Sequence, residues 1–249
     1  MNFKKHIAAP TLAATLALTL VACDSAETGE GALEGDPIEA IAAADGASWA
    51  DTVTVSESDG YITGNPDAPI KLIEYASHTC GGCAGFSTDA SEPLKEKYIS
   101  TGVVSYELRN LVRDPVDLAI ATLVRCGAPE SMVPLSDQAW ASFQEVMTNA
   151  QAANERLAGL DGLPMDQRFV KIGQETGLID FFAARGLSAD QARSCLADTA
   201  QIEGISERSQ TQAEELNINS TPTFILNGQS IGNQSWTTLE PILQKAGAR

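Results

Sequence analysis

A Cys-Gly-Gly-Cys motif at residues 80–83 constrains the fold of this chain more than any other feature, because of what stands on either side of it. The apolar run Ile70–Tyr75 before the motif is typical of a buried strand. A helical pattern follows to about Tyr98, and Pro93 is expected to kink or divide that helix. Val103–Arg109 predicts the next strand. The motif therefore lies inside a β–α–β unit, where the first strand ends and the helix begins.

The rest of the chain divides into a long helical stretch and a second small unit with strands. Apolar residues recur at helical spacing in Val116–Arg125, Leu135–Asn149, Met165–Glu175, Ala189–Ala197, Ile202–Leu216 and Trp236–Ala246, and strands are predicted at Pro222–Asn227 and Gln229–Ile231. A β–α–β half and a β–β–α half on either side of a helical insertion predict an α/β protein with the thioredoxin fold and an inserted all-helical domain. We expect the first half at residues 61–114, the insertion at 115–200 and the second half at 201–249.

The first 22 residues are predicted to be a signal peptide, with two lysines ahead of a mostly apolar stretch that is short for a membrane-spanning helix. This stretch ends in Leu-Val-Ala-Cys, which resembles a bacterial lipobox. The resemblance implies that Cys23 is lipidated and becomes the first residue of the mature chain. The alternative is an ordinary signal peptide that leaves Cys23 as a free thiol. Both imply export, most simply to the periplasm of a Gram-negative bacterium, where disulfides are permitted.

Residues 23–60 are predicted to be the lipidated cysteine and an acidic tether, because positions 24–60 contain ten acidic residues and no Lys or Arg. A short helix is expected near Pro37–Ala44. The formal charge of the whole chain is −17. Such a balance disfavours binding to nucleic acid or electrostatic docking on an anionic lipid surface.

Two cysteines separated by two residues at a helix N-terminus favour redox chemistry. The backbone N–H groups and dipole of the helix stabilise a thiolate on Cys80, the expected nucleophile, and Cys83 is then the resolving thiol. A structural disulfide is a weak alternative because so short a ring adds little loop-closure stability. A zinc site lacks two further ligands, since His6 and His78 are the only histidines. We therefore expect no metal and no cofactor, although copper(I) held by the two thiols would make a metallochaperone a further alternative.

A second signal lies far downstream, where Ser-Thr-Pro-Thr-Phe at residues 220–224 places a proline at the start of an apolar strand. EYASHTCGGC followed much later by STPTFILNGQSIG resembles the DsbA-like branch of the thioredoxin superfamily. The resemblance implies that Pro222 is a cis proline lying against the motif, with Thr221 before it, and that both shape the groove for substrate. Glu74, six residues before Cys80, is a carboxylate in an apolar run, which is costly unless it has a partner or a function. The resemblance implies that Glu74 assists proton transfer for the resolving thiol. The alternative is a strand-edge glutamate that faces water.

Three further residues complete the predicted sites. His78 is assigned to the substrate-facing surface, where its imidazole could lower the thiolate pKa or could be no more than an exposed loop histidine. Cys126 and Cys195 are expected to form a structural disulfide in an oxidising compartment, and two separate buried thiols are the alternative. Gly-Gly between the active cysteines departs from the relatives and leaves the oxidising strength open.

These features together predict a lipid-anchored, periplasmic thiol–disulfide oxidoreductase. Its expected clients are exported proteins with cysteines or disulfides, and a quinone-linked membrane partner would reoxidise the pair. A DsbA-like oxidase is favoured, a reductase or isomerase is the alternative direction, and a redox-inactive thioredoxin-like binding lipoprotein is the alternative class.

Overall fold

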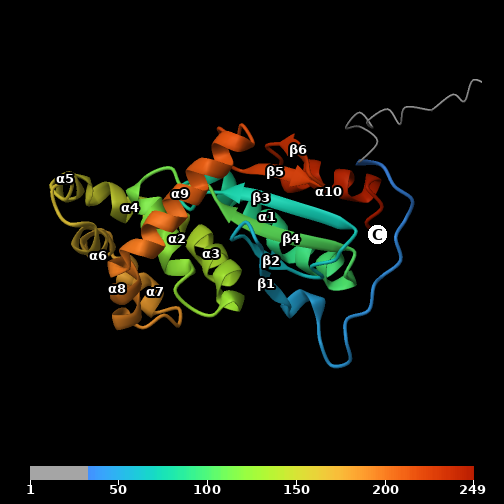
Figure 1. The fold of residues 1–249 in the computed structure, drawn as a ribbon, viewed down its shortest axis with the longest axis horizontal. Helices are drawn as coiled ribbons and strands as arrows, with labels where there is room; N and C mark the ends of the chain where they lie inside the picture. The colour runs from blue at the N-terminus through green and yellow to red at the C-terminus, as the bar shows by residue number, and fades with distance from the viewer. Residues whose placement is uncertain (1–32) are drawn as a thin grey trace, which may run out of the picture.

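The computed structural model describes residues 33–249, and its centre is a six-stranded sheet in the order β1-β2-β4-β3-β5-β6 (Figure 1). The strands are β1 (Val53–Val55), β2 (Tyr61–Thr63), β3 (Ile70–Ala76), β4 (Val104–Asn110), β5 (Thr223–Leu226) and β6 (Gln229–Gly232). β3 and β4 are parallel, as the β–α–β unit requires, and the other neighbouring strands are antiparallel. The predicted α/β fold class is confirmed.

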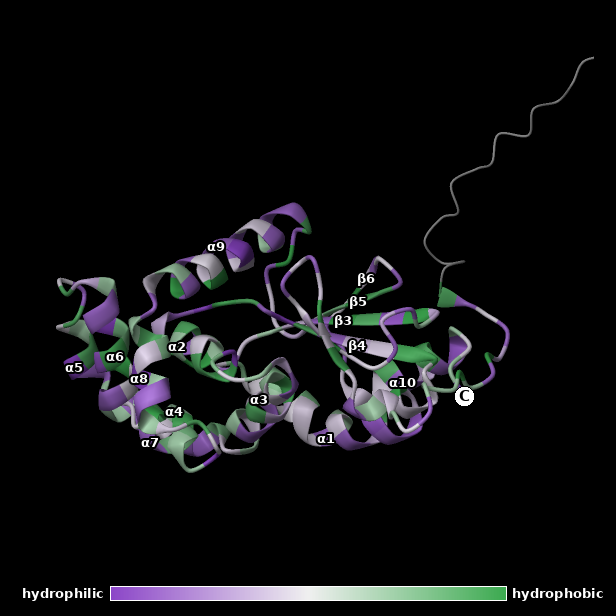
Figure 2. Ribbon diagram, turned by 60° about the horizontal axis from the view of Figure 1, so that its bottom comes forward, coloured by the Kyte–Doolittle hydropathy of each residue, from purple (hydrophilic) through white to green (hydrophobic). Residues whose placement is uncertain are grey.

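The two faces of β3 are covered by different helices. Side chains alternate along a strand, so Leu72, Glu74 and Ala76 share one face of the sheet. That face carries α1 (Gly81–Lys97) and α10 (Trp236–Lys245), and Leu72 and Ala76 belong to the main core. Tyr75 and Ile73, on the other face, belong to a smaller cluster that also contains residues near the end of α9. In Figure 2 β3 is mostly hydrophobic, whereas α9 carries hydrophilic residues along its length.

The helical insertion lies beyond the carboxyl end of β3, next to the CGGC motif (Figure 1). Its helices are α2 (Pro115–Val124), α3 (Met132–Ala141), α4 (Phe143–Ala152), α5 (Asn154–Ala158), α6 (Met165–Glu175), α7 (Leu178–Ala183) and α8 (Ala189–Ala197), and α9 (Thr199–Glu215) returns to the sheet. A disulfide between Cys126 and Cys195 ties the end of α2 to α8, with their Cα atoms 5.9 Å apart. α2 is the buried centre of this region, because every residue from Asp117 to Val124 is buried.

The structure corrects several helix predictions. The single helix expected at residues 135–149 is two helices, α3 and α4, which are interrupted at Ser142. The short helices α5 and α7 were not predicted. Pro93 lies inside α1 without dividing it, since α1 is one continuous helix. Helix boundaries at short polar interruptions are set by packing as much as by local sequence, which explains these differences.

The prediction that residues 23–60 form a solvated tether is wrong for residues 33–60, which are held against the fold although most of residues 33–51 are exposed. The backbone N–H groups of Gly35 and Ile38 donate to the carbonyl oxygens of Lys245 and Gly247, at 3.0 and 2.9 Å. β1 then pairs with β2, so the sheet begins before residue 61. No helix forms at residues 37–44. Acidic composition suggested a solvated segment, but scattered apolar residues such as Ile38 and Val53 pack against the core.

The predicted signal peptide and Cys23 lie outside the described residues. Within residues 33–249, none of the helices has the length and apolar character needed to cross a membrane.

Candidate active site

The CGGC motif occupies the junction that its sequence context predicts. β3 ends at Ala76, a short loop follows, and Cys80 is the N-cap residue of α1 with extended backbone dihedrals. Cys83 lies in the first turn of the helix. Both thiols are free in this structure, and their residues are 6% and 0% exposed. The motif therefore presents Cys80 at the edge of a buried site and holds Cys83 inside it.

The two thiols have opposite acid–base properties. The pKa of Cys80 is lowered from 9.0 to about 5, chiefly because the Cys83 thiol donates a hydrogen bond to its sulfur. The Thr221 hydroxyl and the backbone N–H groups of Cys83 and Gly82 lower it further, while burial opposes them. The pKa of Cys83 is raised far above its usual range by burial, by its bond to Cys80 and by the nearby Glu74 charge. At neutral pH Cys80 is therefore a thiolate and Cys83 a thiol.

The Thr221–Pro222 peptide bond is cis, and this turn lies directly against the motif. When Cys80 is protonated, its thiol donates to the Thr221 carbonyl at 3.2 Å. The Thr221 hydroxyl is buried with no other hydrogen-bond partner, so it is available to the thiolate. A Cβ atom on Gly82 would lie 3.2 Å from Pro222 Cδ, which is a tight contact. Glycine at this position therefore lets the helix and the proline approach closely.

Glu74 lies beneath the motif on the α1 face of β3. It is 1% exposed, so the alternative of a water-facing glutamate is excluded. Its Oε2 atom accepts a hydrogen bond from the Tyr106 hydroxyl at 2.7 Å, and its Oε1 atom has no partner. Burial raises its pKa from 4.5 to about 8. A carboxyl group that is mostly protonated at neutral pH can give a proton to a leaving thiolate.

The assignment of His78 to the substrate-facing surface is wrong. The residue is 1% exposed, and its ring stacks on Trp140 with the ring centroids 5.0 Å apart. Its Nε2 atom lies 3.0 Å from Ser136 Oγ, and its Nδ1 atom lies 3.6 Å from an Asp117 oxygen. His78 therefore joins the active-site loop to α2 and α3, where no client could touch it.

Asp117 is a site residue that the sequence reasoning missed. Its carboxylate accepts hydrogen bonds from the Ser77 hydroxyl (2.6 Å), the His78 backbone N–H (2.8 Å) and the Arg113 backbone N–H (2.9 Å). It thereby fixes the loop that leads into Cys80. An acidic residue inside the apolar run 116–125 carries the same signal that singled out Glu74, namely a buried carboxylate that needs a reason.

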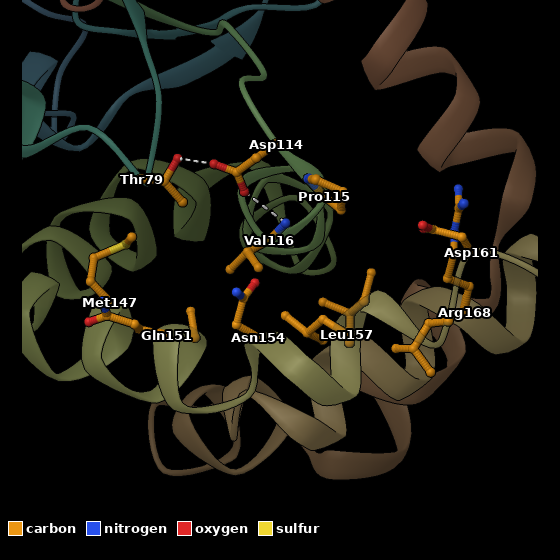
Figure 3. A pocket seen from close by; sticks show the side chains of 13 residues that line it. Thr79, Asp114, Pro115, Val116, Met147, Gln151, Asn154, Leu157, Asp161 and Arg168 are labelled. Atoms are coloured by element: carbon orange, nitrogen blue, oxygen red, sulfur yellow. Dashed lines mark hydrogen bonds between the residues drawn. The ribbon is translucent and has the colours of Figure 1, made fainter.

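A cavity of about 640 Å³ opens beside this loop, between α2 and the segment from α4 to α6 (Figure 3). Thr79, the residue before Cys80, lines it, and the Thr79 hydroxyl donates to Asp114 at 2.6 Å. The apolar lining consists of Pro115, Val116, Met147, Ala150, Leu157, Leu160 and Ile172, and Gln151, Asn154, Asp161 and Arg168 add polar groups. The Nε atom of Arg168 is buried without a hydrogen-bond partner. The site thus combines a reactive thiolate with adjacent apolar surface.

The fold and this unequal pair of thiols define a thiol–disulfide oxidoreductase. A family model described as Thioredoxin matches residues 56–245, and the chain belongs to that family.

Comparisons with individual proteins agree with this family. A Rickettsia bellii protein named "Putative protein-disulfide oxidoreductase" is 24% identical over 195 residues, which are 78% of this chain and 67% of that protein. The chain spans between 62% and 67% of the length of the Rickettsia proteins it matches. The crystal structure of protein-disulfide isomerase from Novosphingobium aromaticivorans is 26% identical, with a TM-score of 0.70 over 74% of this chain and 96% of that one. Wolbachia pipientis α-DsbA1, at 22% identity, has a TM-score of 0.60 over 81% and 96% of the two chains. The DsbA-like fold expectation is confirmed.

Proposed function

We propose that this protein donates disulfides to exported proteins through Cys80 and Cys83. The low pKa of Cys80 carries the proposal, because a thiolate stabilised in the reduced form makes the disulfide a stronger oxidant. A pKa of about 5 favours the reduced protein at pH 7 by about 3 kcal/mol over a thiol of ordinary pKa. This corresponds to about 60 mV in a two-electron couple.

The reaction begins with the Cys80–Cys83 disulfide. A client thiolate attacks Cys80, the disulfide breaks, and Cys83 leaves as a thiolate that takes a proton from Glu74. A second client thiolate then attacks the client sulfur of the mixed disulfide, and Cys80 leaves as a stable thiolate. The client has lost two electrons, and the cysteine pair has gained them.

The client segment is proposed to bind along the Thr221–Pro222 turn and into the cavity beside Thr79. A client cysteine bound to Cys80 lies near both, because the Thr221 carbonyl is 3.2 Å from the Cys80 sulfur and Thr79, which lines the cavity, directly precedes Cys80. The apolar walls of the cavity suit side chains exposed by incompletely folded clients. The unpartnered N–H group at Arg168 Nε would donate a hydrogen bond to a client carbonyl or carboxylate oxygen.

The location is also a proposal. The sequence of residues 1–23 supports export to the periplasm and lipidation of Cys23. A membrane redox partner, quinone-linked for an oxidase, would then recycle the cysteine pair. Metabolic labelling with a radioactive fatty acid tests the anchor. The label should appear on the wild-type chain and disappear in Cys23→Ala, and a labelled variant would contradict lipidation.

One observation favours the isomerase direction as a second candidate. The Novosphingobium protein at 26% identity is named a protein-disulfide isomerase. The redox equilibrium with glutathione, read by trapping the thiols of Cys80 and Cys83, separates the two directions. A couple more oxidising than glutathione supports the disulfide donor, and a strongly reducing couple supports the isomerase or reductase. Exchange at the same rate in a Cys80→Ser control would refute both.

A further inference from the structure

Protons from solvent need a path to the buried pair of Cys83 and Glu74, and neither cysteine nor Glu74 itself provides one. Each cycle transfers a proton from Glu74 to Cys83, and Glu74 must then be reprotonated. Glu74 is 1% exposed and Cys83 is 0% exposed, so bulk water reaches neither. The Tyr106 hydroxyl occupies Glu74 Oε2 as a donor, and its pKa is raised well above 10 by burial. The open side of Glu74 is therefore Oε1.

A small cavity begins at Glu74 and has room for water. Its volume is about 60 Å³, which exceeds the roughly 10–15 Å³ that one water molecule needs. Glu74 Oε1 and Thr63 Oγ1 are both buried without hydrogen-bond partners, and both residues line this cavity. Water in the cavity would satisfy both atoms. Ser87, Ser91, Lys95 and Asp137 add polar groups to its wall.

Asp137, on α3, lines this cavity. It is partly exposed, unlike Glu74. Its Oδ1 atom accepts hydrogen bonds from the Ser87 and Ser91 hydroxyls of α1, at 2.6 and 2.9 Å. Lys95, also on α1, has a half-exposed side chain at the cavity wall. The cavity is thus lined by one fully buried carboxyl group, Glu74, and by one that is partly exposed, Asp137.

We propose that Asp137 is the proton relay of this site, passing protons from solvent through the Ser87–Ser91 side of the cavity to Glu74 and hence to Cys83. The proposal rests on the proposed function, since only disulfide exchange requires this proton. The step moves one proton inward for each Cys83 thiolate protonated, and the reverse reaction moves it outward. Asp137 touches neither thiol, so it acts only through Glu74.

The groups around Asp137 act on the pKa of its carboxyl group in opposite directions. Burial raises the pKa of its carboxyl group, while the hydroxyls of Ser87 and Ser91 and the charges of His78 and Lys95 lower it. The Asp137 charge in turn raises the pKa of Glu74. The two carboxyl groups are therefore electrostatically coupled through the cavity, and a proton on one favours ionisation of the other.

The experiment compares Asp137→Asn with the wild-type chain and with Asp89→Asn, which removes the same charge from an exposed position on α1. The measured quantity is the rate at which the oxidised protein is reduced by a dithiol peptide, followed by rapid quenching and thiol trapping over a range of pH. We expect Asp137→Asn to slow the reaction about tenfold, since a positioned acid or base contributes about 10²–10⁴ in total. Imidazole buffer should restore the rate in proportion to its concentration, and Asp89→Asn should match wild type.

Three controls fix the interpretation. In a Glu74→Gln background, Asp137→Asn should have no further effect, because the relay would have nothing to supply. The equilibrium with glutathione should change much less than the rate in Asp137→Asn, because a proton path alters a rate and Asp137 affects the equilibrium only through its charge on Glu74. Should Asp137→Asn fail to fold, Val133→Leu, which narrows the cavity and keeps the carboxyl group, should give the same slow and rescuable reaction.

Rates within about twofold of wild type, or slow rates that imidazole does not restore, would overturn the relay while leaving the oxidoreductase intact. Absence of exchange in the wild-type chain would instead remove the proposed function itself.

Discussion

The hydrogen bond from Cys83 to Cys80 is the largest cause of the low Cys80 pKa, and removing it gives the sharpest test of the site. Cys83→Ala deletes the donor. Cys83→Ser retains a hydroxyl donor of similar size, so it is the matched control. Both variants break the redox cycle, but both leave Cys80 in place at the N-terminus of α1.

The expected magnitude follows from the charge on the acceptor. A hydrogen bond to a charged group contributes about 1.5–3 kcal/mol, which corresponds to about 1–2 pKa units. We therefore expect the pKa of Cys80 to rise from about 5 to about 6–7 in Cys83→Ala. In Cys83→Ser it should stay within about half a unit of wild type. The Thr221 hydroxyl and the backbone N–H groups of the first helical turn keep it below its ordinary value in both variants.

The assay is the ultraviolet absorbance of the thiolate against pH, checked by the pH dependence of alkylation with iodoacetamide. Within residues 33–249 of either variant Cys80 is the only free thiol, because Cys126 and Cys195 are bonded to each other. With Cys23 blocked, the titration therefore belongs to one group. Equal pKa values near 5 in the alanine and serine variants would refute the reasoning, and would assign the whole effect to the backbone and Thr221.

Three further predictions concern stability and client binding. Glu74→Gln should stabilise the reduced protein by about 3 kcal/mol at pH 7 in urea unfolding. The raised pKa of Glu74 means that protonated Glu74 supports the fold fully below pH 4.5, and that this contribution is lost as the pH rises through about 8. The same variant should slow exchange, and a stability difference that does not depend on pH would contradict the assigned pKa. Replacing Cys126 and Cys195 together by serine should lower the free energy of unfolding by about 4 kcal/mol for a loop of 69 residues, with exchange by the folded protein retained; a loss under about 1 kcal/mol would contradict the loop-closure argument. Asn154→Trp should obstruct the cavity beside Thr79 and raise KM for a peptide client with apolar residues next to its cysteine. Asn149→Trp, at an exposed position of α4 that does not line this cavity, should leave KM unchanged. Equal KM values for the two variants would exclude the cavity from client binding.

Much of the active site could be predicted from sequence because its signals are local. The apolar run before the CGGC motif and the helical pattern after it place the motif between a strand and a helix. Pro222 at the start of an apolar strand is unusual and marks a special backbone geometry. Glu74 was found by the same logic, since a carboxylate in a buried strand needs a partner or a function. Each of these residues breaks a local rule of its element.

The remaining features depend on contacts between distant segments, which no local pattern contains. His78 next to the motif suggested a surface role, yet Trp140 and Ser136 from α3 enclose it. Asp59 near the start of β2 forms ion pairs with Arg125 and Arg208, at 2.7 and 2.6 Å, across the sheet–insertion boundary. Charge composition alone predicts that Asp59 belongs to an acidic tether. Its partners lie 66 residues away and farther, so the sequence could not reveal them.

The docking of residues 33–60 changes what a lipid on Cys23 would permit. As a free segment, residues 23–60 could extend about 130 Å, but Leu33, which packs on the core, is only ten positions after Cys23, and ten residue steps span at most about 36 Å. Figure 1 shows residues 33–48 at the end of the sheet opposite the helical insertion. A lipid-anchored molecule would therefore lie close to the bilayer on a short linker, with its reactive thiol facing away from the membrane. The active site could then meet clients only in a thin layer above the membrane. A membrane partner would have to extend to the active site, or the molecule would have to tilt toward the bilayer.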